Sequence, residues 1–350
     1  MRLAPIALCL TILPCLPAES ADHIHYPGDP DSPVGDQHVV LISGDHEYRS
    51  EEAFPQLAKI LSTHHGFETT VLFAIDPETG EINPDHVENI PGLEVLDDAD
   101  VVVLGLRFRN LPDDQMKRIV DYAEAGRPMV AIRTSTHPFD IPAGRTYHEY
   151  TWDNGIRGDD PAPEGFEGGF GQRIFSETWR YHHGDHKVQS TRGVIADPLH
   201  PIARGIGDAD IWGPTDVYGI TLPLRGSDAH AVVLGQVLSG MSPDDPPVAD
   251  GKNDPMMPVA WTRTYNGGRM FVTTMGSADD LPSEGVRRMI VGGIYWAGSL
   301  EDAITGPLKV DLVGDYRPSP YGFDGWVRGK RPEDYASIEG GGGGDGEGDS

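Results

Sequence analysis

The feature that most constrains the fold is a series of short apolar runs in the first half of the chain. They cover residues 38–43, 69–73, 100–106 and 128–132. Uninterrupted apolar runs of this length are typical of strands that are buried on both faces of a parallel sheet. The sequence therefore predicts an α/β fold rather than an all-helical or an all-β one.

The segments between these runs carry helix signals. Ser50 is the expected N-cap of a first helix that stops at Gly66, because apolar side chains follow it at helical spacing. Pro112 opens a second helix and Gly126 ends it. We therefore expect a mainly parallel sheet with helices on both faces.

The second half has a different character. Residues 140–215 are rich in Gly, Pro, Trp and His and read as a long loop-rich insertion. Strand patterns return at 231–234, 259–261 and 268–273, and a helix is expected over 286–296. No linker separates these parts, so we expect one domain.

The two ends lie outside that domain. Met1-Arg2, an apolar run and small residues before Ala21 form a signal-peptide pattern, which predicts a secreted or periplasmic protein. No later apolar run is long enough to span a membrane. The expected organisation is a signal peptide (1–20), an N-terminal arm (21–37), a main domain (38–315), a C-terminal extension (316–339) and a disordered Gly- and Asp-rich tail (340–350).

Charge and cysteine content narrow the function. The 350 residues carry 27 Lys and Arg against 55 Asp and Glu, a formal net charge of -28. This balance argues against nucleic acid and against anionic membrane surfaces, both of which attract clustered cations. Cys9 and Cys15 both lie in the predicted signal, so the mature chain has no thiol for a disulfide, a zinc site or a nucleophile. A small-molecule partner fits best, and the oligomeric state stays open.

Polar residues follow three of the buried strands directly. The carboxyl ends of parallel strands meet at one edge of a sheet, where ligands bind. Solvated loop residues and helix caps are the competing interpretation, and Asp45 can equally be a turn residue. Arg133 is costly to bury alone, so we expect Asp45, Glu47 or a bound anion beside it. The expected site residues are Asp45, His46 and Glu47 after the first strand, Arg109 after the third, and Arg133 and His137 after the fourth.

A second cluster contains His182, His183, Asp185 and His186. Imidazoles at this spacing can bind a metal on a helix, but Gly184 interrupts the segment and the next residues resemble the start of a strand. Hydrogen bonding to a ligand and a plain surface role are the alternatives. The cofactor therefore stays open; a divalent metal is a candidate, with His46, His137, His182 and His186 as candidate ligands.

Aromatic side chains gather in and near the insertion. Trp152, Trp179, Tyr181 and Trp212 could stack on the apolar faces of sugar rings, and core packing is the competing interpretation.

The chain also resembles the ThuA-like family, named after trehalose utilisation, over about residues 37–300. The matching stretches include 38–47, 126–137, His200-Pro201-Ile202-Ala203-Arg204-Gly205, Asp216-Val217-Tyr218, Pro258-Val259-Ala260-Trp261-Thr262 and Gly292-Gly293-Ile294-Tyr295-Trp296-Ala297. The resemblance implies a flavodoxin-like fold related to class I glutamine amidotransferases, without their cysteine nucleophile. It also implies a role in sugar catabolism beside oxidoreductases that make 3-keto sugars. Met275-Gly276-Ser277 stands where the family usually has Leu-Gly-His.

Two hypotheses follow. In the first, the protein is a carbohydrate-processing hydrolase or lyase that acts on a glycoside or a 3-keto-glycoside. In the second, the same site binds a sugar without turnover. The expected roles are acid–base catalysis or metal binding for His46 and His137, their orientation for Asp45 and Glu47, and substrate binding for Arg109, Arg133, His183, Asp216 and Tyr218.

Overall fold

The computed structural model describes residues 22–157 and 161–338. Its strands are β1 His23–Tyr26, β2 His38–Gly44, β3 Glu68–Phe73, β4 Val101–Leu106, β5 Met129–Ile132, β6 Tyr181–His182, β7 Thr191–Ile195, β8 Trp212–Gly213, β9 Tyr218–Gly219, β10 His230–Val237, β11 Met257–Tyr265 and β12 Gly268–Thr273. Its α-helices are α1 Ser50–Ile60, α2 Asp113–Glu124, α3 Gly169–Phe175 and α4 Glu284–Ala297. The predicted signal peptide and C-terminal tail lie outside the described residues.

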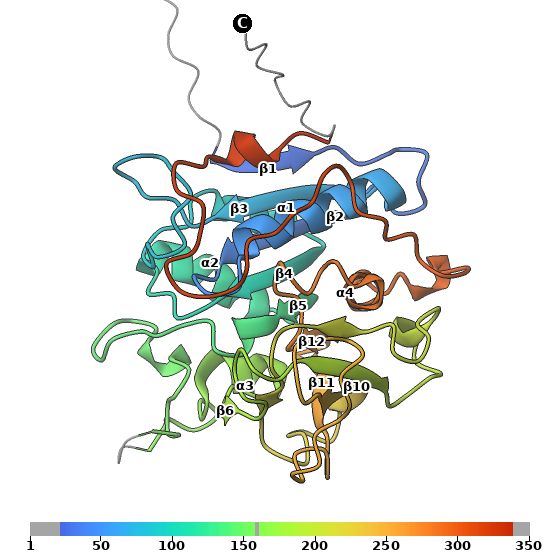
Figure 1. Cartoon of the computed structure of the whole chain (residues 1–350). Helices are drawn as coiled ribbons and strands as arrows, with labels where there is room; N and C mark the ends of the chain where they lie inside the picture. Colours follow the sequence, from blue (N-terminus) through green and yellow to red (C-terminus); the bar gives the residue numbers. More distant parts are fainter. Residues whose placement is uncertain (1–21, 158–160, 339–350) are drawn as a thin grey trace, which may run out of the picture.

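One ten-stranded mixed sheet runs through the molecule in the order β1-β3-β2-β4-β5-β12-β11-β10-β7-β8 (Figure 1). Strands β3, β2, β4, β5 and β12 are parallel, and the remaining pairings are antiparallel. Every residue of β2 and β4 is buried, because helices and loops cover both faces there. The predicted α/β class is confirmed, whereas the sheet is mixed because β1 and the strands from the second half of the chain, β11, β10, β7 and β8, pair antiparallel.

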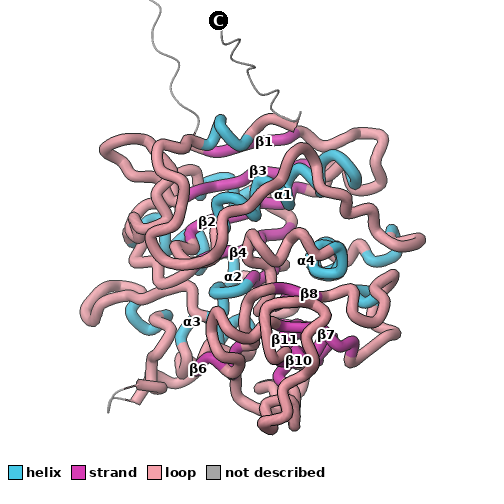
Figure 2. Tube along the Cα trace, in the orientation of Figure 1, coloured by secondary structure: helices cyan, strands magenta, loops and turns pink. Residues whose placement is uncertain are grey.

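The strand order reverses between β2 and β4, since the chain passes from β2 to β3 on one side and then to β4 on the other. Crevices outside the carboxyl ends of strands at such a reversal are where open α/β sheets bind ligands. The loops after β2 and β4 therefore start at the place where the sequence predicts a site. Long loops around the short α3 and β6 adjoin this edge (Figure 2).

Helix α1 begins differently from its prediction. Arg49 is the residue before the helix and has a left-handed backbone, with φ of 57°. Ser50 is the first helical residue, and it does not cap the helix. Its hydroxyl oxygen lies 2.9 Å from the Ser43 hydroxyl and accepts a hydrogen bond from the Asp45 amide at 3.0 Å. The predicted Ser50 cap is therefore wrong, because this hydroxyl holds the β2–α1 turn instead.

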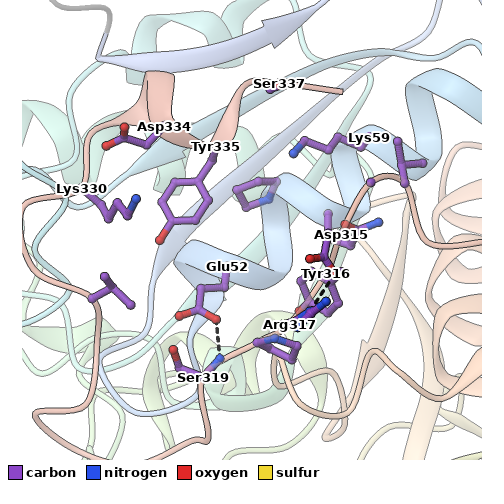
Figure 3. Close-up of a pocket in the computed structure, with 16 residues that line it drawn as sticks. Glu52, Lys59, Asp315, Tyr316, Arg317, Ser319, Lys330, Asp334, Tyr335 and Ser337 are labelled. Carbon is purple, nitrogen blue, oxygen red and sulfur yellow. Dashed lines mark hydrogen bonds and ion pairs between the residues drawn. The ribbon is translucent and has the colours of Figure 1, made fainter. Parts of the chain in front are cut away.

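Both predicted extensions pack on the domain. The N-terminal arm contains β1, which pairs antiparallel with β3 at the sheet edge. The C-terminal segment crosses α1, where the Glu52 carboxylate accepts the Ser319 amide at 2.7 Å (Figure 3). None of the helices in the described parts of the chain has the length and apolar character needed to cross a bilayer.

Candidate functional site

A cavity of about 210 Å³ lies beyond the carboxyl ends of β2, β4 and β5. Its wall combines residues from the loops after these strands with residues from the insertion. The aromatic part of the wall consists of Phe108, Trp152, Trp179 and Tyr218. The polar part consists of Glu47, Arg107, His137, Arg157 and His182. A concave surface with aromatic walls and a few convergent polar groups is typical of small-molecule sites.

His137 lies among the aromatic rings. Its ring centroid is 5.1 Å from that of Phe108, 5.5 Å from Trp179, 5.9 Å from Tyr218 and 6.2 Å from Trp152. Only 2% of the residue is exposed. Burial, and then the charges of nearby arginines, hold the pKa of His137 well below its usual value. His137 is therefore a neutral part of the aromatic wall at neutral pH.

His182 is held by a buried carboxylate. Its Nδ1 donates to Asp216 Oδ2 at 2.7 Å, and the Asp216 side chain is fully buried. The His182 side chain is 41% exposed and lines the cavity. A carboxylate that accepts the Nδ1 proton fixes the tautomer whose Nε2 can accept another proton. The pair is therefore arranged for general base chemistry at the cavity.

Asp216 in turn is held by Arg133. The guanidinium lies 3.0 Å from Asp216 Oδ1 and also donates to the Asp216 and Thr274 carbonyl oxygens, at 2.9 and 2.6 Å. Tyr48 and Tyr218 cover it on their ring faces, 4.3 and 3.9 Å from the centroids. Burial opposes ionisation of Asp216, but the hydrogen bonds from the histidines and the Arg133 charge outweigh it and hold its pKa well below the usual range.

These contacts correct the expected partner of Arg133. The sequence predicts Asp45, Glu47 or a bound anion, whereas the guanidinium is paired with Asp216. Asp45 accepts hydrogen bonds from the Glu47 and Tyr48 amides at 2.8 and 3.0 Å, together with one from the Thr134 hydroxyl. It is therefore the turn residue that the sequence left open, and Arg133 is a buried support rather than a cavity residue.

Glu47 connects the cavity with a second histidine. Glu47 Oε2 lies 3.2 Å from Arg107, and Oε1 lies 3.4 Å from His186 Nε2. His186 Nδ1 in turn lies 3.0 Å from Asp216 Oδ1. Burial raises the pKa of Glu47 above its usual value, although Arg107 acts against this shift. A carboxyl with a raised pKa beside a histidine with an anchored Nδ1 is suited to acid–base exchange.

His46 lies just behind this wall. Its Nε2 is 2.6 Å from the Arg107 guanidinium, and its Nδ1 is 2.9 Å from that of Arg109. Burial, opposed by Asp45 and reinforced by both arginines, lowers the pKa of His46 to about 4. A neutral imidazole with a guanidinium at each nitrogen has no free lone pair for a metal or for a substrate proton.

Two residues that the sequence predicts to bind substrate, Arg109 and His183, make their contacts away from the cavity. Arg109 is fully buried, and its Nε and Nη1 donate to the carbonyl oxygens of Arg107 and His86 at 2.9 and 3.3 Å. Burial lowers its pKa to about 10. His183 Nε2 lies 2.6 Å from the Lys252 carbonyl oxygen. Of the predicted substrate-binding residues, Tyr218 lines the cavity, and Asp216 lies behind His182.

The second histidine cluster also offers metal donors. One atom each from His182, His186 and Asp216 lie within 4.8 Å of one another. Nitrogen and carboxylate donors of this kind suit Zn²⁺. Of the four histidines predicted as candidate ligands, the described structure groups His182 and His186 with a carboxylate and leaves His46 and His137 outside that group. Lys187–Gln189, expected to start a strand, lie outside any strand: Lys187 and Val188 are in a turn, and β7 begins only at Thr191.

Several site residues carry no clear signal in the sequence. Arg107 was visible only as the first polar residue after a buried strand, and nothing marked Arg157, whose guanidinium lies 4.5 Å from the Trp152 ring centroid. The C-terminal extension contributes Tyr321, which stacks on Tyr48 at 5.2 Å, and Phe323, which lies 5.7 Å from His46. Such contacts depend on a segment that is remote in sequence.

A larger cavity of about 360 Å³ lies between α1 and the C-terminal segment (Figure 3). Its wall includes Glu52, Lys59, Asp315, Arg317 and Lys330. It lies apart from the carboxyl edge of the sheet, and none of the described residues that line it is a histidine. The smaller cavity carries the groups that can exchange protons, so we take it as the candidate site.

The fold and the site together define a mixed α/β protein. Its cavity is lined by aromatic and titratable side chains and lies where the strand order of the sheet reverses. The model of the ThuA family, described as trehalose utilisation, matches residues 38–297. The chain therefore belongs to the ThuA family, and its family is associated with carbohydrate use.

Solved structures show more distant similarities. A putative ThuA-like protein from Parabacteroides merdae is 15% identical, with 86% of this chain and 99% of that chain covered and a TM-score of 0.43. One from Bacteroides uniformis is also 15% identical, with 78% and 95% covered and a TM-score of 0.45. A β-galactosidase from Rahnella sp. R3 is 16% identical over 78% of this chain and 33% of that one, with a TM-score of 0.39. A comparison with curated proteins gave no match.

Proposed function

We propose that the protein is a carbohydrate-processing enzyme that cleaves a glycoside or a 3-keto-glycoside by hydrolysis or elimination in the 210 Å³ cavity. The observation that carries the proposal is the His182–Asp216 hydrogen bond of 2.7 Å beside an aromatic cavity wall. Membership of a family described by trehalose utilisation supports a sugar as the substrate.

His182 is the general base of this proposal. In an elimination, its Nε2 accepts the proton from the carbon beside the keto group, while the glycosidic oxygen departs from the neighbouring carbon. In a hydrolysis, the same atom accepts a proton from the attacking water. Asp216 stabilises the imidazolium in both cases, because it is ionised and anchored by Arg133.

Glu47 is the companion acid. It lines the cavity, and burial raises its pKa, so its carboxyl can hold the proton that the departing oxygen needs. Arg107 lies 3.2 Å from Glu47 and lines the same wall, where its guanidinium can hold a substrate oxygen. Trp152 and Trp179, 5.6 Å apart between ring centroids, offer faces for the sugar's apolar C–H groups.

Two finer expectations belong to this proposal. The parallel order β3-β2-β4-β5-β12 is the order 2-1-3-4-5 in chain numbering, which supports a flavodoxin-like core. The signal-peptide pattern of residues 1–20 supports action outside the cytoplasm, in the periplasm or the medium.

The test is a turnover screen of glycosides and 3-keto-glycosides with the purified mature chain and two variants. We expect His182→Ala to lower turnover by about 10²–10⁴, the range for loss of a general base. His183→Ala is the matched control, since the neighbouring imidazole contacts the Lys252 carbonyl oxygen instead of the cavity. We expect this control to retain activity.

Other results of the turnover screen would change the proposal in specific ways. Equal rates for His182→Ala and the parent would remove His182 from the chemistry. Sugar binding without turnover in every case would replace the enzyme proposal by the non-catalytic binding one. A chelator arm completes the screen: a rate that disappears with chelator and returns with Zn²⁺ would assign His182, His186 and Asp216 to a metal centre.

A further inference from the structure

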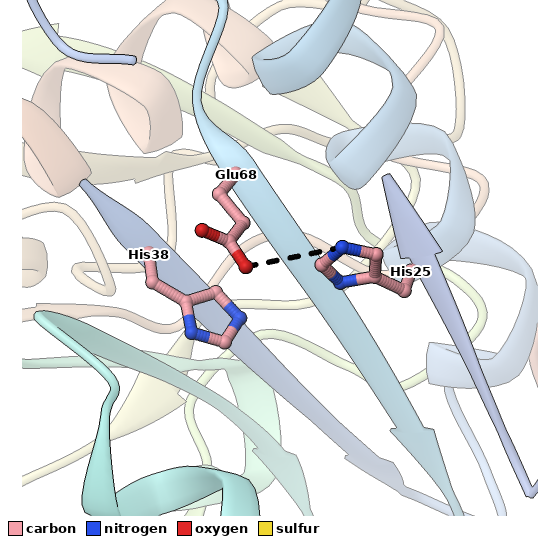
Figure 4. Close-up of side chains that lie close together, drawn as sticks. All are labelled: His25, His38 and Glu68. Carbon is pink, nitrogen blue, oxygen red and sulfur yellow. Dashed lines mark ion pairs between the residues drawn. The ribbon is translucent and has the colours of Figure 1, made fainter. Parts of the chain in front are cut away.

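Three residues at the opposite edge of the sheet form a second group of metal donors. His25 lies on β1, His38 begins β2 and Glu68 begins β3 (Figure 4). One donor atom from each lies within 4.8 Å of the others. We propose that this group is a site for a transition-metal ion, with Zn²⁺ as the ion that its donor set suits best.

The strand register places these side chains together. His38 pairs with Glu68 across β2 and β3, and His25 pairs with Thr70 across β1 and β3. Paired residues point to the same face, and so do residues two apart on one strand. The four side chains therefore share one face because of backbone pairing, before any rotamer is considered.

Thr70 orients the two imidazoles. Its hydroxyl oxygen lies 3.2 Å from His25 Nδ1 and 2.9 Å from His38 Nε2, so it bridges the two rings. His25 Nε2 lies 3.8 Å from Glu68 Oε1. The three donor side chains are thus arranged around one point by contacts that already exist.

Two neutral imidazoles and one carboxylate are a recurrent ligand set for zinc, with a fourth position left for water. Calcium and magnesium prefer oxygen donors, so this set selects against them. Donors bound to one tetrahedral zinc at about 2.0–2.2 Å lie roughly 3.3–3.6 Å apart, which is closer than the 4.8 Å limit within which the present donor atoms lie. The His25 and Glu68 side chains are 44% and 38% exposed, so they can move toward His38 by rotation.

The surroundings favour a cation. The three residues line a surface hollow together with Asp36, Asp98 and Asp100, and the described residues of its lining include neither Lys nor Arg. Anionic side chains around the donors attract a divalent ion and offset its charge. A bound ion would join β1, β2 and β3, and thus fasten the N-terminal strand to the sheet.

The test is zinc binding measured by equilibrium dialysis with metal analysis. The parent for this experiment carries His182→Ala and His186→Ala, which removes the donor group that these histidines form with Asp216. We expect one zinc per chain in this parent, and an affinity at least tenfold lower after His25→Ala or Glu68→Gln. His23→Ala is the matched control, because His23 lies two residues from His25 on the same strand and lines the same hollow.

A second readout is thermal stability. Zinc bound only by the folded chain raises Tm, so we expect a zinc-dependent rise in the parent and in His23→Ala, and its loss in His25→Ala. Zinc binding that is unchanged by His25→Ala and Glu68→Gln would overturn the proposal. So would His23→Ala weakening binding as much as His25→Ala. Neither readout uses enzyme activity, so the result is separate from the fate of the proposed function.

Discussion

Arg133 and Asp216 form an ion pair with a separation of 3.0 Å in which both side chains are almost fully buried. Asp216 also accepts hydrogen bonds from His182 and His186. One carboxylate therefore neutralises a buried cation and orients two imidazoles at the edge of the cavity. Replacement of Asp216 should therefore affect both the stability of the fold and the proposed chemistry.

We expect Asp216→Asn to lower both turnover and stability. An amide leaves Arg133 buried without its ion-pair partner, which costs about 3–5 kcal/mol in comparable cases. It also removes the full anionic acceptor that fixes the His182 tautomer, and we expect a further rate loss of about 10²–10⁴. Urea unfolding and steady-state kinetics on the same preparation measure the two effects.

The comparison variant for this prediction is His182→Gln, because this side chain is 41% exposed. It should lose turnover while its unfolding free energy changes by less than about 1 kcal/mol. An Asp216→Asn protein with full turnover would contradict the proposed role of the pair.

A second prediction concerns the aromatic wall. Trp179→Ala removes a ring that lines the cavity and lies 5.5 Å from His137. We expect KM for a sugar to rise about tenfold with a smaller change in kcat, because the ring contributes to binding rather than to proton transfer. Tyr181→Ala, which replaces an exposed aromatic residue outside the cavity, is the control. A fall in kcat alone would place Trp179 closer to the chemistry than we propose.

Much of the fold was predictable because the signals are local. Buried runs such as 38–43 and 100–106 form β2 and β4 nearly as predicted, and Gly66 and Gly126 follow their helices with positive φ. Strand β1 was missed because it has only four residues, with alternating exposed and buried side chains. An alternating pattern of only four residues forms a strand here because β3 pairs with it.

The site was predictable in position but less so in detail. The cavity at the carboxyl ends of β2 and β5 is lined by Glu47 and His137, as the pattern of parallel strands predicts. The contact between Arg133 and Asp216 joins residues 83 positions apart through the loop-rich insertion, which carries no periodic signal. The environment of His46 depends on two arginines from another loop. Such contacts arise from tertiary packing, which motif spacing does not encode.

A third prediction follows from the pKa of His46, which burial lowers from 6.5 to about 4. Between these values the unfolded chain binds a proton that the folded chain does not. The unfolding free energy therefore falls as pH decreases from 6.5 to 4. We expect His46→Gln to reduce this loss by about 1–2 kcal/mol, measured as urea unfolding across that range.

The control for the acid range is Leu199→Ala, since Leu199 is 91% exposed and has no titratable group. Its pH profile should match that of the parent. If the His46→Gln profile also ran parallel to the parent, His46 would carry its charge in the folded state and the proposed neutral form would be wrong.

The fourth prediction concerns Glu51, for which the unfolding free energy changes with pH in the opposite direction. Burial raises the pKa of Glu51 from 4.5 to about 8, so the folded chain keeps a proton that the unfolded chain releases. The unfolding free energy therefore falls as pH rises from 4.5 to 8. Glu51→Gln keeps the shape and removes the ionisation, so it should stabilise the protein by about 1–3 kcal/mol at pH 8 and by little at pH 4.5. Exposed Glu78→Gln is the control, and equal profiles for the two variants would contradict the prediction.

The last prediction separates His137 from His182. The sequence places His137 at a strand end and predicts acid–base catalysis or metal binding for it. The structure buries it against four aromatic rings, so His137→Ala leaves a cavity and should cost about 2–4 kcal/mol, with a clear fall in Tm. His182→Ala removes a partly exposed side chain and should leave Tm nearly unchanged while turnover falls. Measuring Tm and turnover on the same preparations of both variants tests this contrast. A His137→Ala protein that keeps the parental Tm but loses kcat would contradict the supporting role of His137 and move weight for the proton-transfer role from His182 to His137.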